Sequence, residues 1–264
     1  MIDIHHHLLF DTDDGPKDLD GAVAQAEAAA EDGITHIVCT SHANSTWKFN
    51  PERNRERLDA IRERVGGRLT FGLGCDFHLS YENIAEALEK PRKFTINNGR
   101  YLLVEFADFT IAENIGDTFY QFALRGMQPI ITHPERNPIL QRNPQRIAEW
   151  LRGDCVVQIT AGSLEGRFGK TAQTLAWELL RRRWVHFIAT DAHNLEKRPP
   201  RLRSACEAVA ARFGEETAHR LCVENPRAAF EDRPLGSQPE PEGVYPETEA
   251  GARGGGLMAR LFGR

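Results

Sequence analysis

Short apolar runs alternate with amphipathic segments along most of the chain. Apolar runs of strand length lie at 2–4, 34–40, 69–74, 101–106, 128–132, 155–159 and 185–190. Apolar residues at helical spacing predict helices at 19–32, 51–64, 82–89, 114–125, 144–152, 170–183, 201–213 and 215–222. Strands that alternate with helices indicate parallel β/α units, and about seven such units can close into a barrel.

Local signals mark several boundaries of these elements. Gly33 ends the first predicted helix, and Asn50 is a capping residue in front of the helix at 51–64. The stretch NNG at 97–99 is typical of a tight turn, so we expect a β-hairpin over 94–106.

The composition changes near Asp232, where the chain becomes rich in Pro, Gly and Glu. These residues do not build a core, so we expect one domain over 1–232 and a C-terminal tail over 233–264, disordered over 233–255. The last residues, GLMARLFGR, are apolar and basic, but so short a stretch does not hold a helix alone. We interpret them as a frayed end rather than as an element that docks on a partner or a membrane.

Charge and cysteine content narrow the class of protein. The chain has 33 Lys and Arg against 38 Asp and Glu, a net charge of −5, which does not favour nucleic-acid binding. No apolar run approaches the ~20 residues that span a bilayer, and the start lacks the layout of a signal peptide. The five cysteines form no C-x-x-C pair, which favours a reduced, cytoplasmic location.

Residues of metal-binding type stand at the ends of six of the seven predicted strands. They are His5, His7, His42, Asp76, Glu105, His133, Asp191 and His193. In β/α barrels the carboxyl ends of the strands meet on one face, where active sites are built. Each residue alone has an ordinary explanation, such as a capping acid or a core histidine. Their coincidence at one end of the strands predicts a shared pocket.

The opening segment, MIDIHHHLLFDTDDGP, supplies the first two of these histidines and a further acid. Alternate side chains of an extended segment share a face, so we expect His5 and His7 to point together and His6 to point away. Asp14 adds a carboxylate from the acidic turn. Taken alone, such a cluster is also typical of an expression tag or a surface patch, and the rest of the chain favours a metal site.

These nine residues together provide five imidazoles and four carboxylates. One zinc ion takes about four ligands, so the set predicts a cluster of two or three ions. Mixed histidine and carboxylate ligands suit Mn, Fe or Zn and argue against calcium. Glu105, on a central strand, is our candidate for a carboxylate that bridges two ions. Such a cluster activates water and stabilises the attacking and leaving oxygens of a displacement at phosphorus.

Two arginines follow ligand candidates closely in sequence. Arg136 lies three residues after His133, and Arg198 lies five after His193. A guanidinium group pairs with two phosphate oxygens at once, which predicts that both arginines bind phosphate. A cysteine phosphatase is the rival chemistry, because Cys206 and Arg212 have its spacing. The residues between them, EAVAA, favour a helix rather than a phosphate-binding loop, so we interpret the match as chance.

The motifs resemble those of the polymerase-and-histidinol-phosphatase (PHP) superfamily, and within it the bacterial protein-tyrosine phosphatases of capsule and exopolysaccharide loci, the CpsB/YwqE type. The resemblance covers about 1–230 and is carried by MIDIHHHLLFDTDDGPK, CTSHAN, YLLVEF, ITHPERN, IATDAHNLEKRPP and VENPRAAF. It implies a distorted (β/α)7 barrel and a centre of three metals, manganese or another divalent ion such as Fe, Zn or Mg. It also implies hydrolysis of phosphotyrosine on the tail of a bacterial tyrosine autokinase that controls polysaccharide synthesis.

By motif, the resemblance assigns metal binding to the nine residues above and phosphate binding to Arg136 and Arg198. His42, Asp14 or a site water would protonate the leaving phenolate, and the sequence does not separate these. Two positions depart from the family pattern: His6 stands where a small residue is usual, and Asp76 stands where the family has Glu. The shorter Asp76 is expected to weaken one metal or to require a backbone shift.

Two other functions compete with the protein-tyrosine phosphatase. One is a small-molecule phosphoesterase of the histidinol-phosphate phosphatase type, and the other is a metal-stabilised module that recruits a kinase tail without catalysis. The complete ligand set argues against the second. Trp47 and Phe49, after His42, either flank an aromatic phosphoester or pack against the barrel rim.

Overall fold

The computed structural model describes residues 1–245 as a barrel of seven strands. All neighbouring strands are parallel and follow one another in sequence order: β1 (Ile2–His6), β2 (His36–Ala43), β3 (Thr70–His78), β4 (Tyr101–Glu105), β5 (Gln128–Thr132), β6 (Val156–Thr160) and β7 (Phe187–Ala189). The chain beyond β7 returns to β1, because the Asp191 amide donates to the His5 carbonyl and the His7 amide donates to the Ala192 carbonyl, both at 2.9 Å. The predicted β/α barrel is therefore confirmed.

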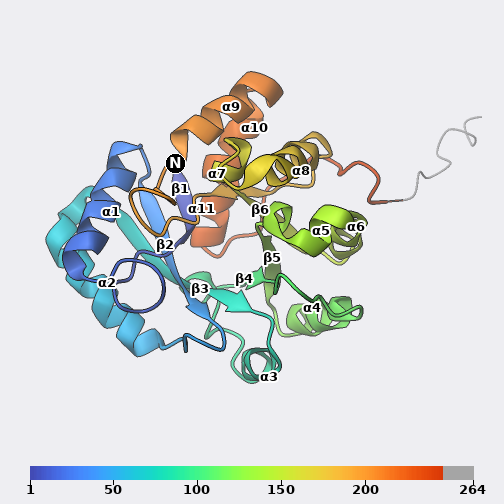
Figure 1. Cartoon of the computed structure of the whole chain (residues 1–264). Helices are drawn as coiled ribbons and strands as arrows, with labels where there is room; N and C mark the ends of the chain where they lie inside the picture. Colours follow the sequence, from blue (N-terminus) through green and yellow to red (C-terminus); the bar gives the residue numbers. More distant parts are fainter. Residues whose placement is uncertain (246–264) are drawn as a thin grey trace, which may run out of the picture.

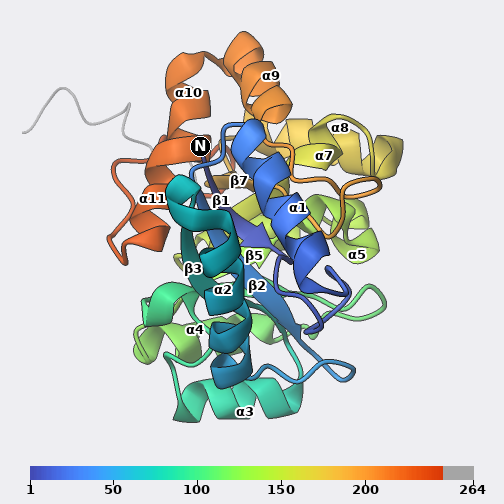
Figure 2. The same ribbon diagram turned by 90° about the vertical axis from the view of Figure 1, so that its left-hand side faces the viewer.

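Helices cover the outside of the sheet (Figure 1). They are α1 (Leu19–Glu31), α2 (Pro51–Val65), α3 (Tyr81–Glu89), α4 (Ile115–Leu124), α5 (Pro138–Arg142), α6 (Gln145–Leu151), α7 (Ala161–Leu164), α8 (Gly169–Arg181), α9 (Arg203–Phe213), α10 (Glu215–His219) and α11 (Asn225–Phe230). Figure 2, turned by 90°, shows α9 and α10 at the top near the N-terminus and α3 at the bottom.

Two apolar clusters form the core on either side of the sheet. The smaller one joins residues from six strands inside the barrel: Ile2, Ile4, Val38, Tyr101, Leu103, Ile130, Val156, Phe187 and Ala189. Their sequence neighbours, such as Leu102, Ile131 and Val157, belong to the larger cluster between the sheet and the helices. Alternate burial on both faces explains why these strands read as continuous apolar runs.

The predicted helices agree with the structure to within two residues, except that the one at 215–222 is α10 followed by a π-helix (Arg220–Glu224). The short helices α5, α7 and α11 were not predicted, and the predicted hairpin is wrong. The side chain of Asn50 caps α2, and Gly33, with φ of 93°, follows α1. The NNG stretch at 97–99 does turn, in a 3-10 helix (Ile96–Asn98), but no strand lies between α3 and this turn. Instead β4 pairs in parallel with β3 and β5. Turn chemistry alone does not distinguish a hairpin from a loop that enters a parallel strand.

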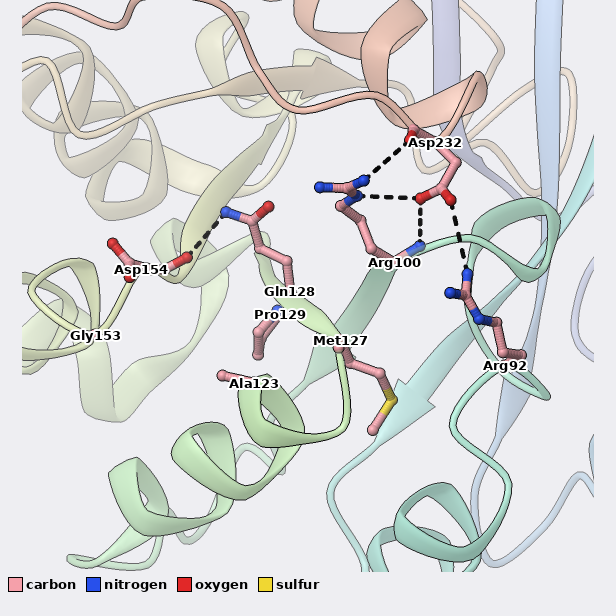
Figure 3. Close-up of a pocket in the computed structure, with 10 residues that line it drawn as sticks. Arg92, Arg100, Ala123, Met127, Gln128, Pro129, Gly153, Asp154 and Asp232 are labelled. Atoms are coloured by element: carbon pink, nitrogen blue, oxygen red, sulfur yellow. Dashed lines mark hydrogen bonds and ion pairs between the residues drawn. The ribbon is translucent and has the colours of Figure 1, made fainter.

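Asp232 fixes the chain at the end of the barrel where the strands begin. Its Oδ1 accepts hydrogen bonds from the amide and the Nε of Arg100, at 2.7 and 3.2 Å, and its Oδ2 lies 3.6 Å from the Nη1 of Arg92. Figure 3 shows these contacts beside a cavity of about 530 Å³. A Cβ on Gly99 would lie 2.7 Å from the Asp232 carboxyl, so this close approach requires glycine.

Residues 233–245 were expected to be disordered, but the structure shows them ordered. We call this segment the strap. The strap packs against the barrel: the Trp184 indole donates to the Glu242 carbonyl at 2.8 Å, and Arg152 donates to the Val244 carbonyl at 2.7 Å. Val244 is buried. A composition rich in Pro and Gly concealed these anchors because the strap is held mainly through its backbone. The rest of the expected tail, 246–264, lies outside the described residues.

One pair of cysteines differs from the reduced state that the sequence analysis favoured. Cys206 in α9 and Cys222 are joined by a disulfide, whereas Cys39, Cys75 and Cys155 are free and buried. Among residues 1–245, no helix has the length and apolarity needed to cross a bilayer.

Candidate metal centre

The nine predicted ligands lie together at the end of the barrel where the strands finish. They form overlapping groups in which side-chain ligand atoms lie within 4.8 Å of one another: His7 with Asp14, His42 and His193; His5 with His7 and Asp76; His5 with His133 and Asp191; and Asp76 with Glu105 and His133. A further group joins His42 and Glu105 to His78, which is not among the predicted ligands. The overlap means that several residues are placed to contact two cations.

The deepest part of the cluster surrounds His5 and His7. The Nε2 atoms of the two rings face each other at 3.3 Å, and the Oδ1 of Asp191 lies 3.4 Å from each. The Oδ2 of Asp76 lies 3.5 Å from the Nε2 of His5 and 3.1 Å from the Nδ1 of His42. Neutral imidazole nitrogens and carboxylate oxygens that converge in this way form a typical transition-metal site.

The outer part of the cluster is built on Asp14 and Glu105. The Oδ1 of Asp14 lies 3.4 Å from the Nε2 of His42 and 3.2 Å from the Nε2 of His193, and its side chain is 44% exposed. The two oxygens of Glu105 face different histidines, Oε1 toward His133 at 3.6 Å and Oε2 toward His42 at 3.6 Å. A carboxylate with this orientation is suited to bridge two cations.

Several buried polar atoms of this cluster have no hydrogen-bond partner within residues 1–245. They are both carboxylate oxygens of Asp76, the Oε2 of Glu105, the Oδ1 of Asp191 and the Nδ1 of His42. A buried polar group without a partner is costly, and such groups are rare in native proteins. Because these atoms all point into the cluster, the donor set fits divalent cations as their missing partners.

The charges of the cluster shift its pKa values strongly. Burial alone would lower the pKa of His5, but the Asp191 and Asp76 carboxylates raise it to about 9. Burial also opposes the charged form of His42, whereas contacts with Asp14 and Asp76 raise its pKa to about 11. Burial and the neighbouring Asp76 charge raise the pKa of Glu105. The site therefore concentrates negative charge that protons or metal cations must balance.

Supporting residues fix the ring orientations of the first two histidines. The Nδ1 of His5 bonds to the Oε1 of Gln158 at 2.9 Å, and the Nδ1 of His7 bonds to the Oδ2 of Asp13 at 2.8 Å. Each contact leaves Nε2 free to face the cluster. Carboxyl and carbonyl groups commonly accept the second ring N–H of metal-binding histidines in this way. Asp13 also accepts the amide of His42 at 3.1 Å. The sequence prediction assigned neither Asp13 nor Gln158.

His6 points away from the cluster, as expected. Its Nδ1 bonds to Asp3 at 3.0 Å and its Nε2 to the Gln25 side chain at 2.8 Å. The register of β1 with β2 shifts between Asp3 and His6, which marks a β-bulge. This irregularity lets Ile4 face the barrel interior while His5 reaches the cluster.

Two candidate ligands have an unusual backbone. His133, after β5, has φ of 33°, and Asp191, after β7, has φ of 52°. Such left-handed conformations cost free energy in non-glycine residues and concentrate at functional sites. Here they turn each side chain back over the ends of the strands.

Arg136 and Arg198 both reach the cluster. Each donates a hydrogen bond to the Oδ2 of Asp191, and Arg198 also donates to the Nε2 of His193 at 3.0 Å. The guanidinium of Arg136 lies 4.3 Å above the ring of Phe168. The two predicted phosphate-binding residues therefore converge on one side of the predicted ligands.

The two aromatic residues after His42 have different surroundings. Trp47 stacks on the His42 ring with centroids 5.4 Å apart, whereas Phe49 packs on Phe94 at 5.4 Å. Trp47 is thus a wall of the site, and Phe49 belongs to the barrel rim. A groove of about 490 Å³ runs beside Asp14 and His193 and includes Lys17, Leu195 and Lys197.

Comparison with known proteins places this arrangement in a family. Residues 1–231 match the model of a family described as "Capsular polysaccharide synthesis, CpsB/CapC". The chain belongs to the CpsB/CapC family. Its relatives include the tyrosine-protein phosphatases CpsB of Streptococcus pneumoniae, 32% identical over 88% of this chain and 99% of CpsB, and YwqE of Bacillus subtilis, 32% identical over 90% and 95%. The putative tyrosine-protein phosphatase CapC of Staphylococcus aureus is 34% identical over 75% of this chain and 79% of CapC.

Solved structures agree with this family membership. A chain from crystal structures of YwqE from B. subtilis and CpsB from S. pneumoniae, described as unique metal-dependent tyrosine phosphatases, superimposes with a TM-score of 0.85. It is 32% identical and covers 91% of this family member and 99% of its own chain. A β-aspartyl dipeptidase from Fervidobacterium islandicum, 12% identical with a TM-score of 0.57, shares the fold alone; it covers 88% of this chain and 72% of its own.

Proposed function

We propose that this chain is a metal-dependent protein-tyrosine phosphatase whose metal ligands are the nine predicted residues. The unpaired buried atoms of Asp76, Glu105, Asp191 and His42 carry this proposal, because they converge where cations would satisfy them. The names of the relatives in S. pneumoniae and B. subtilis, all tyrosine-protein phosphatases, support it. A cysteine nucleophile is not supported: Cys206 lines a cavity with Met1 and Gly33, near the start of β1 and away from the cluster.

Bound divalent cations would activate a water molecule for attack on phosphorus and stabilise negative charge on the phosphoryl group. These cations would be held by five histidines and four carboxylates: His5, His7, His42, His133, His193, Asp14, Asp76, Glu105 and Asp191. Gln158 and Asp13 fix the tautomers of His5 and His7 so that Nε2 faces inward. Glu105, whose two oxygens face His133 and His42, would contribute its carboxylate between the groups that these histidines belong to.

Arg136 and Arg198 bind the non-bridging phosphate oxygens in this proposal. Each guanidinium carries five N–H donors in a planar fork, and only part of that capacity is directed at Asp191. The leaving phenolate takes a proton from a group at the outer part of the cluster. Of the three candidates, His42, Asp14 and a site water, the water fits best, because both side chains are ligands in this proposal. Burial opposes the charged form of Asp14, but hydrogen bonds from His193 and His42 hold the pKa of its carboxyl below its usual range.

The shape of the mouth favours an aromatic phosphoester within a peptide over a small enclosed substrate. Trp47 provides an aromatic wall beside His42, and the groove past His193 is open to solvent along Lys17 and Lys197. We propose phosphotyrosine on a bacterial tyrosine kinase tail as the substrate, a cytoplasmic location, and a role in capsule or exopolysaccharide synthesis. Manganese, iron and zinc are the proposed ions, because mixed histidine and carboxylate ligands suit all three.

Turnover by the purified chain loaded with Mn²⁺ tests this function. We expect a phosphotyrosine peptide to be hydrolysed with a kcat/KM at least about tenfold above that for histidinol phosphate, since only the peptide uses the wall and the groove. The reverse preference would establish the small-molecule phosphoesterase instead. Metal binding without hydrolysis of either substrate would favour the module that recruits a kinase tail.

A further inference from the structure

His78 lies at the outer edge of the predicted cluster without an assigned role. It is the last residue of β3, two positions after Asp76 and therefore on the same face of the strand. In the register of the sheet, His78 is the direct neighbour of Glu105 on β4. Its side chain is 28% exposed, whereas that of Asp76 is 1% exposed. On this face of β3, His78 thus lies near the surface of the site and Asp76 lies at its bottom.

The contact between His78 and Glu105 is close but is not an ordinary hydrogen bond. The Nε2 of His78 lies 2.6 Å from the Oε2 of Glu105. That oxygen nevertheless has no partner in hydrogen-bond geometry within residues 1–245. Because no N–H is directed between these two atoms, both are available to a shared cation once His78 withdraws slightly.

His42 completes a three-residue group at this position. One ligand atom each from His42, His78 and Glu105 lies within 4.8 Å of the others. The Nδ1 of His42 lies 3.6 Å from the Oε2 of Glu105 and also lacks a hydrogen-bond partner in this part of the chain. Ligands about 2.1 Å from one ion lie roughly 3–3.5 Å apart, so the His42 and Glu105 atoms need little movement to share a cation, and His78 has to withdraw slightly from Glu105.

Local structure holds the backbone of His78 in place. Its carbonyl accepts hydrogen bonds from the Asn83 side chain and from the amide of Ser80, both at 2.9 Å. The side chain of Ser80 in turn caps α3. The ring therefore projects from a strand end that the first turn of α3 fixes, as a pre-organised ligand requires.

We propose that His78 is a tenth metal ligand, which binds the outermost cation together with His42 and Glu105. The inference rests on the proposed metal centre and extends it. A merely structural histidine would instead donate a hydrogen bond to Glu105 and orient it. A replacement side chain must supply a ligand atom for the first role and a hydrogen-bond donor for the second, so substitutions can separate the two roles.

Metal binding by the full chain tests the assignment. The chain is stripped with a chelator and titrated with Mn²⁺, and bound metal per chain is measured by elemental analysis after gel filtration. We expect His78→Ala to lose one equivalent or to bind it at least tenfold more weakly. His78→Glu, which supplies an oxygen ligand, should restore that equivalent, and His78→Gln, which supplies mainly a hydrogen-bond donor, should not. With Co²⁺, the visible absorption of His78→Ala should lose the contribution of one site.

A matched histidine provides the control. His219→Ala removes an imidazole that is 59% exposed and pairs with Glu224, so metal content should equal that of the unchanged chain. Circular dichroism checks that each variant is folded. If His78→Ala binds the full number of ions with unchanged affinity, or if Gln restores binding and Glu does not, the ligand role of His78 is overturned while the metal centre stands. An unchanged chain that binds no ion would overturn the metal centre itself.

Discussion

Asp191 shows how single residues balance charge in the cluster. One of its oxygens accepts hydrogen bonds from Arg136 and Arg198, and the other faces His5 and His7. Burial would raise the pKa of this carboxyl, but Arg198, His5 and Arg136 hold it well below its usual range. Asp191 is therefore a carboxylate at neutral pH, with its outer oxygen joined to the arginines and its inner oxygen directed at the ligands.

The first prediction concerns these arginines. Arg136→Ala and Arg198→Ala should each lower kcat/KM for a phosphotyrosine peptide by about 10²–10³, because each removes charge-assisted donors to the phosphoryl group. Lysine at either position should recover only part of the loss, since it lacks the planar fork. Arg125→Ala, at the exposed end of α4, is the control and should keep full activity. Steady-state kinetics check this, and an unaffected kcat/KM in either alanine variant would exclude that arginine from phosphate binding.

A second prediction concerns His186, before β7. Burial lowers its pKa to about 4, and its Nδ1 accepts the amide of Val157 at 3.2 Å. An unfolded histidine titrates near ~6.5, so between about pH 6.5 and 4 the unfolded chain binds a proton that the native chain does not. The free energy of unfolding should therefore fall by about 2 kcal/mol from pH 7 to 5 through this residue.

His186→Gln isolates that contribution, because glutamine can still accept the Val157 amide but does not titrate. Urea unfolding of the metal-free chain at pH 7 and 5 should show a smaller loss of stability for the variant than for the unchanged chain. Equal losses in the two proteins would mean that His186 is protonated in the native state.

Sequence reasoning worked at the residue scale where chemistry and position coincided. All nine predicted ligands lie in the cluster, because eight of them stand in or just after the ends of strands and Asp14 stands on the loop that follows β1. It missed Asp13 and Gln158, which act through other residues. The signal for Gln158 was available, since a glutamine inside the apolar run VVQIT must find a buried partner. His78 was not assigned either, because its role depends on the register of β3 with β4, which the sequence alone does not reveal.

Among the elements, the strap changes the picture most. Besides the Trp184 and Arg152 contacts, Arg183 donates to the Glu240 carbonyl at 2.8 Å, and the Glu242 amide donates to the Arg182 carbonyl at 2.9 Å. Arg182, Arg183 and Trp184 lie between α8 and β7, which places them at the end of the barrel opposite the cluster. We infer that the strap stabilises this end and takes no part in catalysis.

Removal of the strap tests that role. In a chain that ends after Arg233, the free energy of unfolding should be about 1–3 kcal/mol lower. The truncation exposes the apolar surface that Val244 covers and removes several backbone hydrogen bonds. Its kcat should be unchanged. A chain that ends after Tyr245 keeps every described contact and is the control. Identical urea midpoints for the two truncated chains would contradict a stabilising strap.

The elements also show where prediction from sequence stops. Helix and strand positions followed from periodicity and capping residues such as Asn50 and Gly33. The expected hairpin over 94–106 failed because parallel pairing across the barrel, a long-range effect, determines the partners of β4. The bulge in β1 was equally invisible, although the alternation of His5, His6 and His7 still held.

At the scale of the whole molecule, the barrel brings residues that are far apart in the sequence into one site. Ligand candidates from His5 to His193 meet because seven parallel strands end at one rim. The fold therefore followed from strand–helix alternation, and the site followed from the fold. The family assignment agrees, since the match over 1–231 spans every strand and every predicted ligand.

The most direct test of the account is metal content per chain, measured with phosphotyrosine phosphatase activity before and after chelation. We predict about two or three divalent ions per chain, loss of activity with EDTA, recovery with Mn²⁺, and nearly full activity in Cys206→Ser. A metal-free chain that retains full activity would contradict the account, as would a Cys206→Ser chain that keeps its metal but loses turnover.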